Sequence, residues 1–233
     1  HLEEQGVHII IQAQIKQVTS SAIQLETGDT VEFDQLLIAT GRKPNTQVVN
    51  ALNIEMDGSF IQVNAFNQTS TDHIYAIGDL VKGYQLAHTA SAQGVVVAEK
   101  LAGLNPKPVN PNEITRCIYT RIEAASVGLS EQQAKDAGYD VAVTESSFQG
   151  NAKAMIKGEP QGFIKIVSDK QYNEILGAFI VGPHATDLIG EVLGVKVSEG
   201  TIHELSQIIQ PHPSLLETIG EGADALFKKA IHM

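Results

Sequence analysis

The proline-punctuated stretch Asn105–Pro111 divides the chain, and the pattern that follows it constrains the fold most strongly. After this linker, short apolar strands alternate with segments that carry helix caps. The expected strands cover residues 114–119, 124–128, 141–147, 162–168 and 175–181, and the expected helices cover 130–137, 185–198, 202–208 and 215–230. This order predicts an α+β domain in which an antiparallel sheet carries helices on one face.

The first 111 residues have a different pattern. Strands are expected over 7–11, 15–18, 22–26 and 31–33, separated by turns such as Thr27-Gly28-Asp29. The continuous apolar runs 36–39 and 74–77 predict buried strands, the first of them parallel, and a helix is expected over 86–101 with Gly103 as its C-terminal cap. These shifts predict three segments, 1–40, 41–111 and 112–233.

Composition excludes several classes of function. The formal net charge is −11 and no basic cluster occurs, so neither nucleic acid nor an anionic membrane is an expected partner. No apolar run approaches the ~20 residues of a membrane span, and no signal peptide is recognisable. Cys117 is the sole cysteine, which precludes an internal disulfide and favours a reducing, cytoplasmic location. The histidines lack the spacing of metal ligands, so no metal site is expected.

The segment from Gln210 to Glu217 places a histidine between two prolines. Pro213 fixes its own φ and disfavours a helical backbone at His212, so the imidazole is expected on a stiff, non-helical stretch. Ser214 is expected to be a helix N-cap, with Glu217 at the third helical position. There the carboxylate either bonds the Ser214 backbone amide in a capping box or orients His212 as the partner of a general base.

Two polar turns follow predicted buried strands. Gly78-Asp79 follows residues 74–77, at the strand end where open α/β sheets bind ligands. Its aspartate either accepts hydrogen bonds from a ribose or polyol hydroxyl or simply terminates the strand. Gly41 follows residues 36–39 and either permits close approach of a nucleotide or is an ordinary loop glycine.

Five motifs occur together in a characteristic order. They are Ala39-Thr-Gly-Arg-Lys-Pro-Asn45, Tyr75-Ala-Ile-Gly-Asp79, Leu86-Ala-His88, Tyr119 through Gly128, and His212-Pro-Ser-Leu-Leu-Glu217. In this order and spacing the chain resembles the second half of the pyridine nucleotide-disulfide oxidoreductases, and within that family most of all the dihydrolipoyl dehydrogenases. The resemblance covers nearly all of the 233 residues.

The resemblance implies a domain plan for the chain. Residues 1–40 would be the C-terminal part of an NAD-binding domain, the remnant of a dinucleotide-binding α/β fold, and 41–111 would be a central, FAD-contacting segment. Residues 112–233 would be the α+β interface domain of a homodimer. The implied cofactor-binding residues are Gly41 beside NAD and, beside FAD, Gly78, Asp79, Gln85, Leu86, Ala87 and His88.

The same resemblance implies a catalytic pair. His212 would be the base that takes a proton from the substrate dithiol across the dimer interface, and Glu217 would orient it. The implied activity is oxidation of protein-bound dihydrolipoamide with reduction of NAD, on the lipoyl-bearing protein of a 2-oxoacid dehydrogenase-type complex.

The sequence also departs from the family. Arg121-Ile122 stands where members commonly carry His-Pro, and both dinucleotide glycine motifs and the redox cysteine pair are missing. We therefore expect a fragment of the enzyme, inactive by itself and without bound FAD. A sibling reductase of the glutathione or mercury type is one alternative. A non-catalytic dimerisation module is another, since the apolar positions of residues 185–198 exceed one helix face.

Overall fold

A computed structural model describes residues 1–232, which form two compact units, one over residues 1–43 and one from residue 44 onward. The first unit holds a short 3-10 helix and an antiparallel sheet in the order β1-β2-β3. Its elements are η1 (Glu3–Gln5), β1 (Ile15–Val18), β2 (Ala22–Leu25) and β3 (Thr30–Glu32). Gly28, at φ 95°, supplies the left-handed residue that the turn between β2 and β3 requires.

Two apolar segments of this unit are not strands, so the prediction for residues 7–11 and 36–39 is wrong. Neither segment has a ladder partner among the described residues, and their side chains are exposed, Ile11 by 79% and Leu37 by 88%. A buried parallel strand needs a neighbour on each side to pair its backbone. The described residues of the unit provide only the three-stranded sheet.

The second unit begins with hairpins and one long helix. Its first elements are η2 (Gln47–Leu52), β4 (Met56–Asp57), β5 (Phe60–Ile61), η3 (Gly78–Leu80), α1 (Ala87–Leu101) and η4 (Pro111–Glu113). The strand predicted at 74–77 is reduced to an isolated bridge between Tyr75 and Gln68. The Ala76 amide donates to the Asn67 carbonyl at 3.0 Å, so this stretch pairs with a nearby turn rather than with a parallel sheet.

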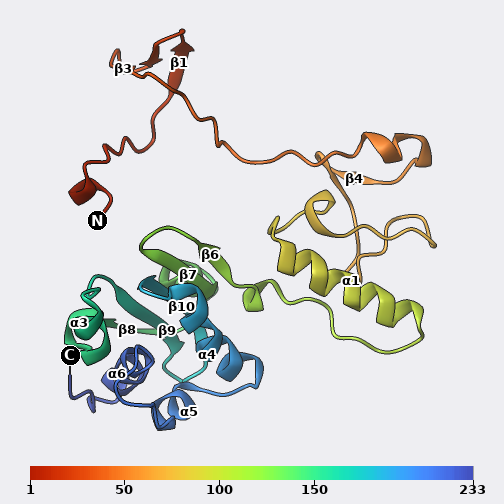
Figure 1. The fold of residues 1–233 in the computed structure, drawn as a ribbon. Coiled ribbons are helices and arrows are strands. Elements are labelled where there is room, and N and C mark those ends of the chain that lie inside the picture. The colour runs from red at the N-terminus through yellow and green to blue at the C-terminus, as the bar shows by residue number, and fades with distance from the viewer. Residues whose placement is uncertain (233) are drawn as a thin grey trace. The chain divides into compact units, whose positions relative to one another are not determined.

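The predicted antiparallel sheet of the interface region is confirmed. Five strands lie in the order β6-β7-β10-β9-β8 (Figure 1). They are β6 (Arg116–Ile118), β7 (Glu123–Gly128), β8 (Val141–Ser147), β9 (Phe163–Asp169) and β10 (Ile175–Gly182). Central β10 places Ala178 opposite Val127 and Ile166, all three fully buried, which aligns apolar side chains across the middle of the sheet.

Three helices cover one face of this sheet, as expected, but a fourth covers the other. Helices α4 (Ala185–Val197), α5 (Ile202–Gln207) and α6 (Glu217–Leu226) share one core with the strands (Figure 1). In α2 (Glu131–Asp136), Ala134 packs instead with Val167 and Leu176. Ile166 belongs to the first core and Val167 to the second; since successive strand residues point to opposite faces, α2 lies on the opposite side.

The apolar surplus expected on residues 185–198 is largely used within the subunit. Leu188, Ile189 and Val192 are buried, and Leu193 and Val195 pack against the same core. Of the six apolar positions, only Val197 is substantially exposed, by 49%. The helix therefore does not by itself mark a subunit contact, and that interpretation is corrected.

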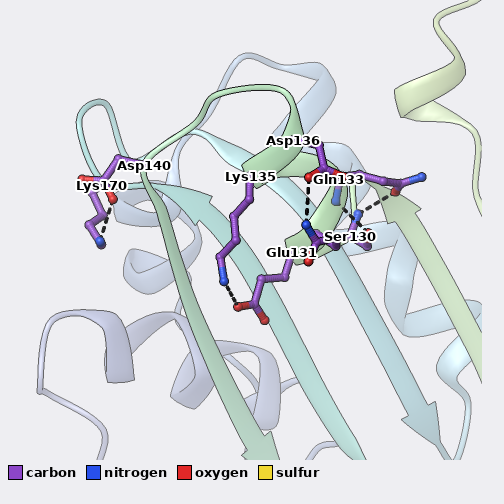
Figure 2. A network of polar contacts seen from close by, with 8 residues as sticks. Ser130, Glu131, Gln133, Lys135, Asp136, Asp140 and Lys170 are labelled. Atoms are coloured by element: carbon purple, nitrogen blue, oxygen red, sulfur yellow. Dashed lines mark hydrogen bonds and ion pairs between the residues drawn. The ribbon is translucent and has the colours of Figure 1, made fainter.

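Short polar contacts fix the ends of α2 (Figure 2). Ser130 and Gln133 form a reciprocal capping box, in which each side chain bonds the other residue's backbone amide. Lys135 pairs with Glu131 at 2.6 Å along the helix. The box satisfies two of the orphan donors at the helix start, which is worth about 1 kcal/mol, whereas an exposed ion pair of this kind contributes less.

A buried phenyl ring holds a segment that the sequence did not predict as helical. Phe148 opens η5 (Phe148–Gly150), is fully buried, and belongs to the main core. The short helix α3 (Ala152–Lys157) follows. Its N-cap is Asn151, whose side-chain oxygen accepts the Ala154 amide at 2.9 Å. The Phe148 anchor and the Asn151 cap therefore fix the backbone that lies next to His212 in the site described below.

Candidate active site

His212 and Glu217 are in contact. The imidazole Nδ1 and the carboxylate Oε1 are 2.8 Å apart, a hydrogen-bond distance. The ring is exposed over 72% of its side-chain surface, against 28% for Glu217. The stiff segment that carries the ring contains a cis peptide bond between His212 and Pro213. Because Nδ1 is held by Glu217, Nε2 is the ring nitrogen available to a proton donor from outside.

The other carboxylate oxygen of Glu217 has its own partner. Oε2 accepts the backbone amide of Ser214 at 2.8 Å, so one side chain performs both of the roles that the sequence left open. The predicted cap itself is wrong: Leu216 is the N-cap and Glu217 is the first residue of α6. The Ser214 hydroxyl is buried without a hydrogen-bond partner among the described residues, so no complete capping box forms.

The environment of Glu217 favours its ionised form. Burial alone raises the pKa of this carboxyl group. Hydrogen bonds from the Ser214 amide and from His212, followed by electrostatic attraction to His212 and His232, together outweigh that effect, so the pKa of Glu217 lies below its ordinary value. The carboxylate can therefore stabilise an imidazolium on His212 while remaining charged.

We expect a carbon-13 NMR titration of Glu217 to give a midpoint below that of an ordinary glutamate. Because the folded pKa is lowered, the associated stability is present above the ordinary glutamate pKa and is lost as the pH falls through the lowered value. The substitution His212→Ala removes a hydrogen bond that favours the carboxylate, so the midpoint should rise. The same midpoint in this variant would show that the imidazole and Glu217 do not interact in solution.

A hollow of about 140 Å³ lies beside the pair. Its lining residues are Ser146, Ser147, Gly150, Asn151, Ala152, His212, Glu217, Thr218, Glu221 and His232. Asn151 is not predicted from the sequence; its side-chain amide donates to the Ser214 carbonyl at 2.8 Å and so ties the end of η5 to the segment that carries His212. An asparagine in front of a short helix was the only available signal, and it indicates a cap rather than this distant bond.

The turn at Gly78-Asp79 and the start of α1 are brought together. The Gly78 amide donates to the Gln93 side chain at 2.7 Å, and the Gln85 side chain donates to the Asp79 carbonyl at 3.4 Å. Gly78 has φ 68°, and a Cβ there would lie 3.1 Å from that of Ala90, so glycine suits both the backbone and the close approach of the helix.

The first turn of α1 fits a ligand that offers hydrogen-bond acceptors. Leu86 at the N-cap gives no side-chain bond, which leaves the first amides, including that of Ala87, for an outside acceptor. The Thr89 hydroxyl in the same turn is buried without a partner in the described part of the chain. The first-turn amides fit an acceptor such as a polar ring edge of a flavin, whereas the buried Thr89 hydroxyl identifies no ligand. The His88 ring contacts the Thr115 carbonyl at 2.9 Å and thereby links α1 to the strand that follows.

Gly41 lies in the first unit, which ends at residue 43. It has φ 104° and no atom within 4 Å of the position that a Cβ would take. The backbone there is open to close approach, but no contact identifies what would approach it.

The described residues contain neither a metal-binding cluster nor a membrane-spanning helix. No group of three or more histidine, cysteine or acidic side chains within residues 1–232 is arranged to hold a metal ion. Over the same residues, no helix combines the length and apolar character that crossing a membrane demands.

Comparison with known proteins decides the family. Residues 1–94 match the model described as pyridine nucleotide-disulphide oxidoreductase, and residues 114–223 match the dimerisation domain of the same family. The two matches together cover most of the chain. The chain belongs to the pyridine nucleotide-disulfide oxidoreductase family. Its C-terminal sheet and helices are therefore the family's dimerisation domain.

Similar curated members of this family are dihydrolipoyl dehydrogenases. One from Bacillus subtilis is 41% identical over 99% of this chain and 51% of its own length. Another, from Thermus scotoductus, is 36% identical over 99% of this chain and 48% of its own length. The chain thus spans about half the length of the curated relatives it matches.

Solved structures agree on the family fold. LpdA from Mycobacterium tuberculosis superposes with a TM-score of 0.88 at 26% identity, over 97% of this chain and 50% of that chain. RclA from Escherichia coli, an HOCl-induced flavoprotein disulfide reductase in a Cu(II) complex, gives 0.87 at 24% identity, over 97% of this chain and 53% of that chain, which shows the fold alone.

Proposed function

We propose that this chain is the C-terminal part of a dihydrolipoyl dehydrogenase, in which His212 is the general base and Glu217 orients it. The observation that carries the proposal is the 2.8 Å contact between Nδ1 and the carboxylate, on a ring that is otherwise largely exposed. The dihydrolipoyl dehydrogenases among its relatives support the choice of substrate.

The chemistry follows from the need for a thiolate. A dithiol attacks a disulfide only after it loses a proton, because the thiolate is the nucleophile. Nε2 of His212 takes that proton, and Glu217 stabilises the resulting imidazolium. The substrate thiolate then forms a mixed disulfide with one enzyme sulfur and releases the other. The second substrate thiol displaces the enzyme sulfur, which leaves oxidised lipoamide and an enzyme dithiol.

The residues of the first helix turn are proposed to hold FAD. The Ala87 amide would donate to the O2 edge of the isoalloxazine ring, near Gln85, Leu86 and His88, while Gly78-Asp79 would bind the ribityl hydroxyls. Gly41 would lie beside NAD. When bound, FAD accepts the electrons of the dithiol and passes them to NAD. With Cys117 as its sole cysteine, the 233-residue chain cannot form the enzyme disulfide, so we propose that it is inactive alone. We also propose that it holds no FAD, because it spans about half the length of its relatives and most flavin contacts would lie in the other half.

A homodimer is the proposed setting of the base. The match to the family's dimerisation domain supports it, and the exposed apolar pair Ile208 and Ile209, the latter exposed by 95%, lies just before His212. We take this pair as part of the surface that the partner subunit covers, since contiguous exposed apolar patches mark interaction sites. Across such an interface His212 would act on the partner subunit's disulfide. The lipoyl-bearing protein of a 2-oxoacid dehydrogenase-type complex is the proposed substrate carrier, in a reducing cytoplasm.

The substrate assignment is tested with full-length protein that contains this chain. We expect rapid oxidation of dihydrolipoamide with NAD and little reduction of oxidised glutathione with NADPH, since the relatives at 34–41% identity include several dihydrolipoyl dehydrogenases. The measurement is the steady-state ratio of kcat/KM for the two reactions. A higher value with glutathione would reassign the protein to a sibling reductase of the same family.

A further inference from the structure

The chain reverses direction directly after α6. Lys228 has φ 59°, in the left-handed region, and its amide donates to the Ala225 carbonyl at 3.0 Å. The next amide, of Lys229, reaches back to the Asp224 carbonyl, also at 3.0 Å. This is the Schellman arrangement, in which glycine is usual because a side chain is strained in this conformation. The turn is therefore formed at a cost, which contacts made by the segment that follows must offset.

Glu221 supplies contacts of this kind. The amides of Ile231 and His232 donate to its Oε2 at 2.8 and 3.0 Å. Glu221 lies four residues after Glu217 on α6, so the two carboxylates stand one turn apart on the same side of the helix. Glu217 holds the segment of the base, while Glu221 holds residues 229–232, which we call the returning segment.

The returning segment also lies against η5. A Cβ on Gly150 would be 2.2 Å from the His232 carbonyl oxygen, a backbone atom that cannot rotate away. A side chain at position 150 would therefore displace the segment. His232 lines the same hollow as His212 and Glu217, and its attraction is one of the smaller causes that lower the pKa of Glu217.

We propose that Glu221 is a positioning residue: it fixes the returning segment as a wall on the carboxylate side of the His212–Glu217 pair and so restrains the Glu217 side chain. The restraint is geometric. With the wall in place, Glu217 keeps one oxygen on His212 and the other on Ser214. Without it, the hollow opens further and water competes more strongly for both oxygens of Glu217, which is already 28% exposed. The catalytic consequence, though not the restraint itself, rests on the proposed function.

Amide hydrogen exchange tests the restraint without any assay of activity. In Glu221→Ala, exchange at Ile231, His232 and Ser214 should quicken about 5-fold or more, because local opening becomes easier. Glu221→Gln keeps an oxygen in the same place and should give an intermediate rate. Gly150→Ala displaces the segment from the opposite side and should reproduce the effect at Ser214. Unchanged exchange at Ser214 in both alanine variants would overturn the proposal.

Kinetics of full-length protein then test the consequence. Glu221→Ala and Gly150→Ala should each lower kcat about 3- to 10-fold with KM unchanged, because misplaced catalytic groups slow chemistry more than they weaken binding. The double variant should be little worse than either single one, since both act through the same segment. A fully additive double variant, or a normal kcat together with fast Ser214 exchange, would contradict the positioning role.

Two controls separate the causes. His232→Ala keeps the backbone amides that Glu221 binds and should leave exchange at Ser214 nearly normal; fast exchange there would place the effect in the ring rather than in the wall. Glu131→Ala removes a surface carboxylate from α2 and should change neither exchange nor kcat. If His212→Ala proved fully active, the proposed function would fail, whereas the exchange result would still decide the restraint.

Discussion

His212→Ala in full-length protein should lower kcat for dihydrolipoamide oxidation about 10²- to 10⁴-fold, the usual contribution of a positioned general base. Without the imidazole, the substrate thiol must lose its proton to water, and only a small fraction is thiolate near neutral pH. The absorbance of bound flavin should be unchanged, because the ring is largely exposed and its hydrogen bond is to Glu217 rather than to the α1 segment proposed to hold FAD. Rising pH should partly restore the rate as the thiol ionises unaided.

A second histidine provides the control for this substitution. His73→Ala removes an exposed ring from a loop of the same unit and should leave kcat and flavin content at their normal values. Loss of flavin in His212→Ala would make the residue structural, and a normal kcat would remove it from the mechanism. In hybrid dimers that pair a His212→Ala subunit with a subunit lacking its redox disulfide, about half of the activity should survive if each base serves the partner subunit's disulfide, and almost none if each base serves its own.

Phe148→Ala should lower the free energy of unfolding by about 3–5 kcal/mol, among the largest effects expected of a single truncation in a core. The ring is fully buried, and a Cβ on Gly182 would lie only 2.7 Å from its Cε2, so the phenyl group packs directly on the end of β10. Its removal leaves a cavity and frees η5, which carries Gly150. The measurement is the midpoint of urea unfolding followed by circular dichroism.

Phe148→Leu is the matched control. It keeps most of the apolar volume and should cost no more than about 1.5 kcal/mol. A similar loss in both variants would mean that the shape of the ring, not the buried volume, stabilises this corner. A loss below about 1 kcal/mol in Phe148→Ala would show that neighbouring residues collapse into the space.

Local signals predicted most of the interface domain. The strand at 141–147 was placed with the observed ends, and the helix after Ser130 with its cap, because each rests on short-range periodicity and capping. The strand predictions for residues 7–11 and 36–39 are wrong because an apolar run gives no information on whether partner strands are present. For a parallel strand those partners decide the structure.

Some contacts of the candidate site could likewise be predicted from local sequence, and others could not. The contact between His212 and Glu217 could be expected from two nearby positions and a stiff backbone. The start of α6 was misplaced by two residues, because a Ser-x-x-Glu pattern does not show that the carboxylate also reaches an imidazole. Asn151 and Glu221 make their bonds to segments 63 and 10–11 residues away, and only the tertiary fold brings these groups together.

The two oxygens of Glu217 are both engaged within a single polypeptide. Under the proposed function, each protomer would thus carry its half of the catalytic apparatus already preorganised before it meets its partner subunit. Docking of two such halves would require no rearrangement of the base and would incur no extra loss of side-chain entropy there. Activity would then require only that two protomers associate. Dilution below the dimer dissociation constant should abolish the activity while leaving the imidazole geometry intact.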